Sequence, residues 1–509
     1  MKFSLIRYSA IFFVALITTL HTTAMTKRSA SADEITINAE STIDEIREEL
    51  KTMRVYVLEF SMQDSVFPTF DKIDSPEGCT GAGITNNEYV LGKLQVFFQG
   101  EELYDSGEYV KKESGVKVKV RGNTSSYKDS IKRKSYKVKL EKKEDLLFRG
   151  DKIFKDKEWV LLGHASDYIH YLPGFELGRI LGLGWEPELI HVAVIMNNSY
   201  MGSYYLAEPV KRSDCRVDID ETGYIVENDA YWWKPDETYF KSNHQLMAAG
   251  WTFKEPDTDD FDEMSVENIK WVINTVEQKL FAEEPLNELI DFKTFAAWLL
   301  AHDIMNTQDP LGSNVFVTKY DFNHLQPFTS KLKMGPVWDI DDTFRTKNEE
   351  FSLIHRFKEF WYWKIWDIPE FREEYDNLWK EVRGDLKEKA MAKLKTYLEG
   401  NPDIYKLRLM DVARGLKLSE PEDPALRYEE LGQWFDHRIG VLNKLILNES
   451  EGGESGIEEV GNSTYVGNGG TQNAGEQKNY SVSGVSVGEN TKGLTINVNP
   501  NGKTSKLIR

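Results

Sequence analysis

The sequence predicts an α+β fold in which a β-rich N-terminal part precedes a largely helical C-terminal part. Strand-like patterns gather within residues 50–230, whereas the 3,4 spacing of amphipathic helices prevails over residues 260–448. The chain has 509 residues, of which 40% are hydrophobic and 12% aromatic, so it can bury a large core. No internal repeat at a fixed period interrupts this order.

The expected N-terminal strands are of two kinds. Residues 53–60 (MRVYVLEF) and 89–98 (YVLGKLQVFF) have the apolar composition of strands, whereas GVKVKVRG and KSYKVKL alternate strictly. Because strand side chains alternate between faces, one face of the alternating segments turns toward the core. The core-facing residues are Val116, Val118, Val120, Tyr136, Val138 and Leu140. The opposite face is cationic and carries Lys117, Lys119, Arg121, Lys137 and Lys139.

Helical periodicity begins in the second half of the chain. Residues 265–284 and 291–306 have the spacing of amphipathic helices, and Asp291 is the expected N-cap of the second. Strand character returns in NVFVTKY and KLKMGPVWDI. The aromatic segment 351–448 is again helical.

The two ends of the chain predict export. Residues 1–32 contain a basic start and the apolar run YSAIFFVALITTL, which is the layout of a signal peptide and is short for a membrane span. An uncleaved N-terminal anchor is the alternative. Residues 449–478 have the composition of a flexible linker, and residues 479–509 regain short alternating strands. This last segment resembles the small C-terminal elements of exported proteins of the Bacteroides and Prevotella group.

The net charge bears on the expected binding partners, and the cysteine content bears on disulfide bonding. The formal net charge is -20, and loss of residues 1–32 removes four cations and no acids, which gives -24. Such a surface repels nucleic acid and anionic lipid, so neither is an expected partner. The two cysteines, Cys79 and Cys215, are far apart in sequence, and spacing alone does not decide whether they pair.

One ordered set of residues suggests phosphoryl transfer. That chemistry needs a carboxylate that accepts the proton of the attacking hydroxyl, and Asp and Asn oxygens that hold Mg²⁺ against phosphates. Asp309 and Asn314 have the D-x-x-x-x-N spacing after the helix 291–306, and a predicted hairpin then leads to Asp339 in WDID. Asp341 is expected on the same strand face as Asp339. In isolation Asp309 would read as a turn residue, because loops are rich in Asp and Asn.

Several longer segments resemble the CotH (spore coat protein H) kinase family. They are VRGNTSSYKDSIKRKSYKVKL, NNSYMGSYYLAEPVKRSDCRVDID, GYIVEND, KLKMGPVWDID and WYWKIWDIPEFREEYDNLWKEV. The resemblance implies an atypical, compact protein-kinase-like fold over residues 33–448. It further implies ATP as phosphoryl donor, Mg²⁺ as cofactor and exported proteins as acceptors, and so a secreted or cell-surface enzyme.

The resemblance also implies roles for individual residues. Asp309 is the expected catalytic residue, and Asp339, Asn314 and Asp341 are the expected metal ligands. The expected nucleotide-binding residues are Arg121 and Asn123 of the RGN motif, Lys137, and Glu208. Glu208 is expected either to pair with Lys137 or to contact the nucleotide directly.

Three departures from the expected pattern define the main alternative. The chain has no G-x-G-x-x-G loop, it carries Leu172 and Pro173 where the family has an Arg-Asn pair, and DTFRTKN follows WDID where a Gly-Asn is frequent. A secreted pseudokinase that acts as a binding or adhesion module, with exposed aromatic residues in AYWWKP, is therefore the alternative function.

The sequence also bears on two enzyme classes outside the kinases. DIDDTF fits the D-x-D-x-T pattern of haloacid dehalogenase-type phosphatases, which requires a doubly wound α/β sheet. A zinc protease of the H-E-x-x-H type is excluded because that motif is missing.

Overall fold

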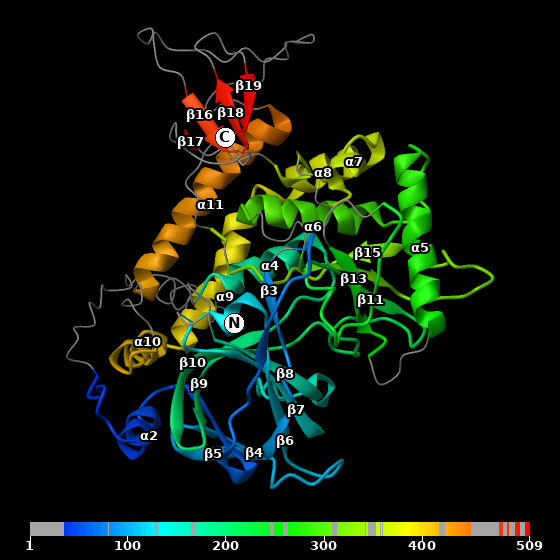
Figure 1. Ribbon diagram of the computed structural model, residues 1–509. Helices are drawn as coiled ribbons and strands as arrows, with labels where there is room; N and C mark the ends of the chain where they lie inside the picture. Colours follow the sequence, from blue (N-terminus) through cyan, green and yellow to red (C-terminus); the bar gives the residue numbers. More distant parts are fainter. Residues whose placement is uncertain are drawn as a thin grey trace, which may run out of the picture. The chain divides into compact units, whose positions relative to one another are not determined.

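The computed structural model describes residues 35–448, except 80, 129–130, 164–168, 245–248, 258–262, 308–312, 342, 345–352, 357, 359 and 417–422, and four short strands between 478 and 508. The chain divides into two compact units, Met1–Glu451 and Gly452–Arg509. The larger unit has the expected α+β composition, with strands first and helices later (Figure 1).

The N-terminal sheet closes into a barrel. Its strand order is β1-β9-β10-β8-β7-β6-β4-β5, and β4 also pairs with β1. The pairing of β1 with β9 is parallel, and the other described pairings in this sheet are antiparallel. The strands are β1 (Tyr56–Met62), β4 (Val90–Phe98), β5 (Glu101–Asp105), β6 (Val116–Arg121), β7 (Ser135–Glu144), β8 (Asp156–Leu162), β9 (Leu189–Met196) and β10 (Ser199–Ala207).

Alternation along the strands decides what fills the barrel. Val116, Val118 and Val120 of β6 are at most 1% exposed, and the same parity places Val138 of β7 in the same core. The lysines between them lie on the outer face, as the alternation predicts. Helix α2 (Ile43–Lys51) packs outside the barrel, and Thr42 caps it through a capping box.

The second sheet lies in the helical part of the unit. It is antiparallel, with the order β12-β13-β11-β14-β15. The strands are β11 (Tyr224–Asp229), β12 (Tyr239–Phe240), β13 (Gly250–Glu255), β14 (Val315–Lys319) and β15 (Leu332–Met334). The strand expected over residues 331–340 is thus shorter than predicted, because Pro336 has no N–H group with which to continue the ladder.

Helices cover this sheet and form the largest core. In Figure 1 the barrel strands lie in the lower half of the picture and helices α4 to α8 lie above them. Asp291 caps α6 by accepting the N–H groups of Lys293 and Thr294, which confirms the predicted helix start. The helices are α4 (Tyr171–Leu181), α5 (Glu263–Phe281), α6 (Phe292–Met305), α7 (Tyr362–Ile365), α8 (Pro369–Val382), α9 (Leu386–Gly400), α10 (Ile404–Ala413) and α11 (Pro424–Leu447).

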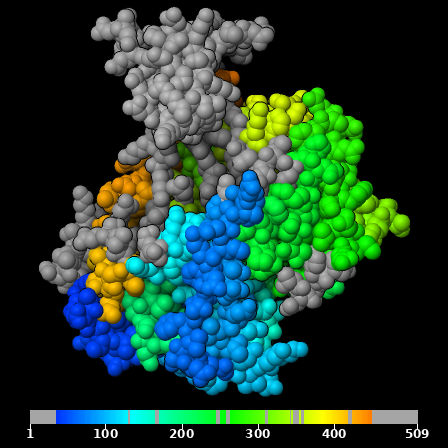
Figure 2. Space-filling model, viewed as in Figure 1, coloured from blue at the N-terminus to red at the C-terminus, as the bar shows by residue number. Residues whose placement is uncertain are grey.

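A hairpin reaches from the barrel to the helical part. Its strands are β2 (Asp71–Asp74) and β3 (Ala82–Thr85). A Cβ atom at Gly81 would lie 3.5 Å from the Tyr231 hydroxyl, and one at Gly83 would lie 3.1 Å from the Lys234 side chain. Figure 2 shows this blue hairpin lying against the green residues of the helical part.

The smaller unit contains an antiparallel sheet of order β17-β16-β18-β19. Its strands are β16 (Lys478–Ser481), β17 (Ser486–Val487), β18 (Leu494–Val498) and β19 (Thr504–Ile508). Apart from Lys478, they fall in the segment 479–509, where the sequence regains alternating strand patterns.

Candidate active site

A cavity of about 890 Å³ lies where the barrel meets the second sheet. Its size falls in the range of about 300–1,000 Å³ that is usual for small-molecule sites. Strands β6, β7 and β8 supply one wall, and β11, β13 and the segments beside β14 and β15 supply the other. The lining includes six of the predicted site residues: Arg121, Asn123, Lys137, Asn314, Asp339 and Asp341.

The barrel wall of the cavity is cationic. Lys119 of β6 and Lys137 of β7 are directly opposite each other in the ladder, and both line the cavity. Burial and the charge of Lys137 lower the pKa of Lys119. Together with Arg121, this pair is the part of the predicted cationic sheet face that a ligand in the cavity would meet.

Glu158 of β8 lies close to three lysines, one of which is Lys137. Its carboxylate lies 2.9 Å from Lys137 Nζ, 3.1 Å from Lys139 Nζ and 3.9 Å from Lys211 Nζ. Burial alone raises the pKa of Glu158, but the charges of Lys137, Lys211 and Lys139 outweigh it and lower that pKa to about 2. Glu158 is therefore ionised at neutral pH and fixes the ammonium group of Lys137 at the cavity.

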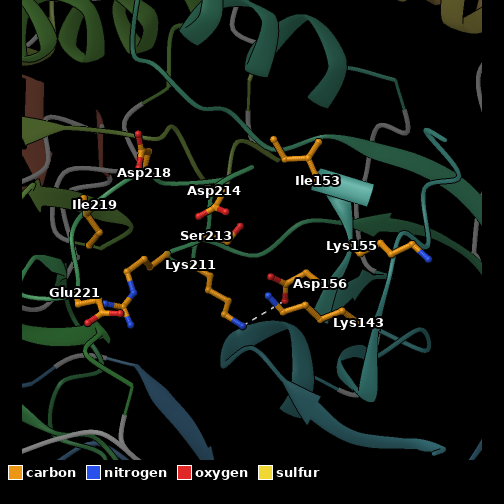
Figure 3. Close-up of a pocket in the computed structure, with 11 residues that line it drawn as sticks. Lys143, Ile153, Lys155, Asp156, Lys211, Ser213, Asp214, Asp218, Ile219 and Glu221 are labelled. Carbon is orange, nitrogen blue, oxygen red and sulfur yellow. Dashed lines mark hydrogen bonds and ion pairs between the residues drawn. The ribbon is translucent and has the colours of Figure 1, made fainter. Parts of the chain in front are cut away.

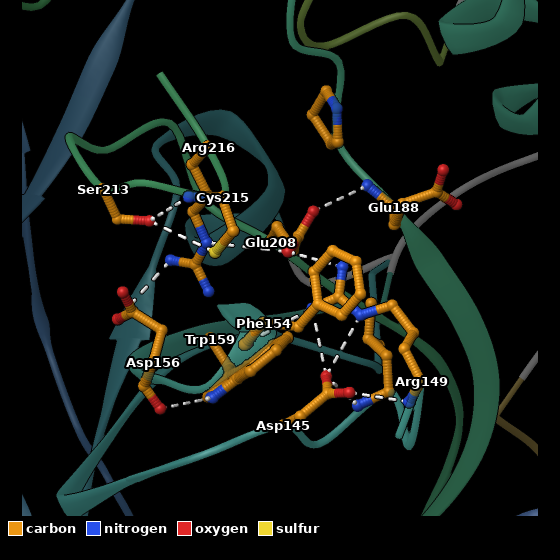
Figure 4. A network of polar contacts seen from close by, with 12 residues as sticks. Asp145, Arg149, Phe154, Asp156, Trp159, Glu188, Glu208, Ser213, Cys215 and Arg216 are labelled. Atoms are coloured by element: carbon orange, nitrogen blue, oxygen red, sulfur yellow. Dashed lines mark hydrogen bonds and ion pairs between the residues drawn. The ribbon is translucent and has the colours of Figure 1, made fainter. Parts of the chain in front are cut away.

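The predicted pairing of Lys137 with Glu208 is wrong. Glu208 is 0% exposed and, among the described residues, is not part of the cavity lining. It accepts a hydrogen bond from Arg149 Nη1 at 2.9 Å and one from the N–H of Glu188 at 3.1 Å (Figure 4). The reason is the strand order, because β8 lies between β7 and β10 and brings Glu158, not Glu208, next to Lys137.

The RGN motif turns the chain at the end of β6. The Arg121 guanidinium lies 5.7 Å from the ring centroid of Trp338. Trp338 is the residue that precedes Asp339 in the chain. Gly122 has φ 91°, and a Cβ atom there would lie 2.6 Å from Ser125 Oγ, so only glycine fits this position without strain. Asn123 follows with a buried Oδ1 that has no hydrogen-bond partner among the described residues. The motif thus presents a cation and an amide to the cavity.

Asn314 and Asp339 meet on the opposite wall. Asn314 precedes β14, Asp339 follows β15, and Asn314 Nδ2 donates to Asp339 Oδ2 at 3.2 Å. Both residues have left-handed backbones, with φ 61° and φ 53°. Asp339 therefore lies outside any strand, and the strand face that Asp341 was expected to share with it does not exist, although Asp341 also lines the cavity. Asp309, the expected catalytic residue, lies outside the described residues.

Strand β11, within the segment GYIVEND, adds two carboxylates to the cavity that the sequence did not predict as site residues. Glu227 and Asp229 lie two residues apart and so share a strand face, and both line the cavity. Burial, and next the negative charge of Glu227, raise the pKa of Asp229 to about 7. Two acids at this spacing inside an apolar strand were the signal that could have located them.

A smaller cavity of about 440 Å³ is drawn in Figure 3. It shares Lys211 with the first cavity. Both cations and acids line it, and Lys211 Nζ lies 3.2 Å from Asp156 Oδ1. None of the predicted site residues that the structure describes lines this cavity.

The residues of the main cavity fit a nucleotide with its metal ion. Mg²⁺ prefers carboxylate and amide oxygens and is usually held by one or two carboxylates together with substrate phosphates. Asp339 and Asn314 offer such oxygens, while Arg121, Lys119 and Lys137 offer charge to phosphates. Within the described residues, no group of three or more His, Cys, Asp and Glu side chains could hold a metal ion by itself.

A comparison with protein families matches residues 118–405 to the family described as CotH kinase protein. The chain belongs to the CotH kinase family. The matched segment runs from β6 into α10 and contains every predicted site residue from Arg121 to Asp341. A comparison with curated proteins found no match.

Two further findings concern the alternatives. The five-stranded sheet that precedes WDID is antiparallel in all its described pairings, so the doubly wound sheet of haloacid dehalogenase-type phosphatases is not present there. Trp232 and Trp233 are half-buried, so the expected exposed tryptophans of AYWWKP are not found.

Over the part of the chain that the structure describes, no helix has both the length and the apolar character to cross a membrane.

Proposed function

We propose that this member of the CotH kinase family is a secreted atypical protein kinase that uses Mg²⁺ and transfers the γ-phosphoryl group of ATP to a hydroxyl of an exported protein. The observation that best supports this is the meeting of Asn314 and Asp339, two potential metal ligands, across one cavity from the cations Lys137 and Arg121. Kinases need both kinds of group at the phosphates: ligands for Mg²⁺ and cations that bind phosphate oxygens.

Each wall of the cavity would have its own task. Bound Mg²⁺ would neutralise charge on the phosphates. Asp339 and Asn314 would hold this ion, with Asp341 as a supporting ligand. Lys137, fixed by Glu158, would bind phosphate oxygens through charge-assisted hydrogen bonds, and Arg121 would add a second cation.

Asp309 would accept the proton of the acceptor hydroxyl, since it stands five residues before Asn314 as the catalytic Asp of kinases does before its Asn. The signal-peptide layout of residues 1–32 supports the proposed export, and N-terminal sequencing of the mature protein should find a start between residues 25 and 33. Retention of Met1 in a cytoplasmic fraction would contradict export.

Two substitutions separate metal binding from chemistry. Asp339→Ala removes a metal ligand, so both the affinity for Mg²⁺-ATP and phosphoryl transfer should fall. Asp309→Asn should preserve Mg²⁺-ATP binding and lower transfer by roughly 10²- to 10⁴-fold, the usual effect of losing a general base. Calorimetric titration beside transfer of labelled phosphate, with co-exported proteins as acceptors, measures both quantities.

Asp367→Asn is the matched control, because Asp367 is an exposed acid between α7 and α8 and should change neither quantity. Wild-type protein that binds no Mg²⁺-ATP at millimolar concentration would rule out the kinase. Binding without any transfer would instead support the pseudokinase, a non-catalytic surface binding or adhesion module.

A further inference from the structure

Glu227, a carboxylate of the cavity, contacts both a lysine and the backbone of Asn314. Glu227 Oε2 lies 2.7 Å from Lys254 Nζ, and Glu227 Oε1 accepts a hydrogen bond from the N–H of Asn314 at 3.1 Å. Asn314 in turn donates to Asp339 at 3.2 Å. A continuous series of polar contacts therefore runs from Lys254 through Glu227 to the two proposed metal ligands.

The backbone of the second sheet brings Glu227 and Lys254 together. Glu227 lies in β11, the central strand of the second sheet, where it is opposite Thr252 of β13 and Phe316 of β14. The register between β11 and β13 shifts at Ile225 and Val226, so Lys254 is the extra residue of a β-bulge. Bulges redirect side chains and are frequent near active sites. Here the bulge brings Lys254 to the cavity beside Glu227.

The backbone conformation of Asn314 is one that needs stabilisation by contacts with other residues. Its φ of 61° is in the left-handed region, which non-glycine residues adopt at a cost of about 1–2 kcal/mol, although Asn tolerates it better than most. The hydrogen bond from its N–H to Glu227 is a contact that stabilises this conformation. The same N–H would need another partner if Glu227 moved away.

Burial makes the Glu227 contact sensitive to its partner. The Glu227 side chain is 8% exposed and that of Lys254 is 31% exposed. Burial lowers the pKa of the Lys254 ammonium, but attraction by Glu227, Glu237 and Asp229 outweighs this and raises it above the ordinary value. Lys254 therefore stays charged. Without it, the buried Glu227 carboxylate would lose the cation that lies 2.7 Å away, while Asp229 lines the same cavity.

We propose that Glu227 and Lys254 are positioning residues of the kinase site: Lys254 fixes the Glu227 carboxylate, which holds the backbone of Asn314 so that its side chain stands beside Asp339 as a metal ligand. The inference rests on the proposed function, because it concerns the metal site of that reaction. Neither residue needs to touch the metal or the nucleotide. They affect the reaction by fixing the position of Asn314.

Binding of Mn²⁺ in place of Mg²⁺, followed by electron paramagnetic resonance in the presence of a non-hydrolysable ATP analogue, tests this without relying on activity. Lys254→Met should weaken Mn²⁺ binding about 10-fold or more, the effect usual for residues that orient metal ligands. Lys254→Arg keeps the positive charge and should stay within about 3-fold of wild type. In transfer assays Lys254→Met should lower kcat and raise the Mg²⁺ requirement, with the acceptor KM unchanged.

Lys93→Met is the matched control, since Lys93 pairs with Asp105 at 2.6 Å on a distant part of the barrel and its side chain is 22% exposed. It should leave Mn²⁺ affinity at the wild-type value. If Lys254→Met fails to fold, Glu227→Gln, which keeps the volume but removes the charge, gives the same decision.

Wild-type affinity for Mn²⁺ in folded Lys254→Met or Glu227→Gln protein would overturn the inference and leave the kinase proposal standing. Loss of affinity in Lys254→Met that Lys254→Arg does not restore would also overturn it, because the charge would not be the cause. Wild-type protein that binds neither Mn²⁺ nor the nucleotide analogue would overturn the proposed function itself.

Discussion

Replacing Glu158 with Gln should destabilise the fold at neutral pH and much less at acidic pH. The carboxylate side chain is 7% exposed and lies within 3.1 Å of the ammonium groups of both Lys137 and Lys139. Its pKa falls from the ordinary 4.5 to about 2. That difference corresponds to about 3 kcal/mol of stability, because a tenfold change in an acid dissociation constant corresponds to about 1.4 kcal/mol.

The sign of the pH dependence follows from the direction of the pKa change. A carboxylate whose pKa is lower in the folded state contributes its full stabilisation above the unfolded pKa and loses it as the pH falls through the folded pKa. The contribution of Glu158 should therefore be about 3 kcal/mol at pH 7, about 1.4 kcal/mol at pH 3 and close to zero below pH 2. The amide that replaces this carboxylate in the E158Q protein does not titrate, so the two proteins should converge in stability as the pH falls.

Urea unfolding of wild-type protein and E158Q at pH 7, 4 and 3 measures this difference. Glu144→Gln is the control, because Glu144 pairs with Lys155 at 2.7 Å but both side chains are more exposed, at 28% and 38%. Such a pair should contribute about 0–1 kcal/mol. An E158Q loss that is equal at pH 7 and pH 3 would refute the electrostatic reasoning, as would a loss at pH 7 no larger than that of the control.

Two further predictions concern residues outside the cavity. Glu208→Ala leaves the half-buried Arg149 and the buried Arg216 without the carboxylate that they share. It should lower the free energy of unfolding in urea by about 3–5 kcal/mol, whereas the nucleotide affinity of the folded protein should not change. A selective loss of nucleotide affinity would show that Glu208 belongs to the site. Deletion of residues 449–509 should leave the calorimetric transition of the larger unit nearly unchanged, because a linker of that composition makes few packing contacts. A clear drop in Tm would show that the tail stabilises this unit.

The kinase family and the α+β class were accessible from local patterns and motifs. Alternation in β6 and β7 predicted which valines are buried and which lysines face outward, because side-chain direction in a strand depends on parity alone. The cap of α6 was predicted from Asp291 for a similar reason, since a cap involves only residues two or three positions away. The order of helix, hairpin and WDID then pointed to Asn314 and Asp339, which the structure brings within 3.2 Å of each other.

Contacts between distant segments were not accessible in this way. The sequence by itself determined that Lys137 faces outward, but its carboxylate partner depended on which strand lies beside β7, and that is a result of long-range pairing. The β-bulge at Lys254 likewise exists only between two paired strands, and so does its contact with Glu227. The conformation around Asp339 depends on where β15 ends, after which neighbouring segments hold the chain. Periodicity acts between neighbours in the chain, whereas partners across a cavity are chosen by the packing of the whole fold, which the tertiary structure alone decided.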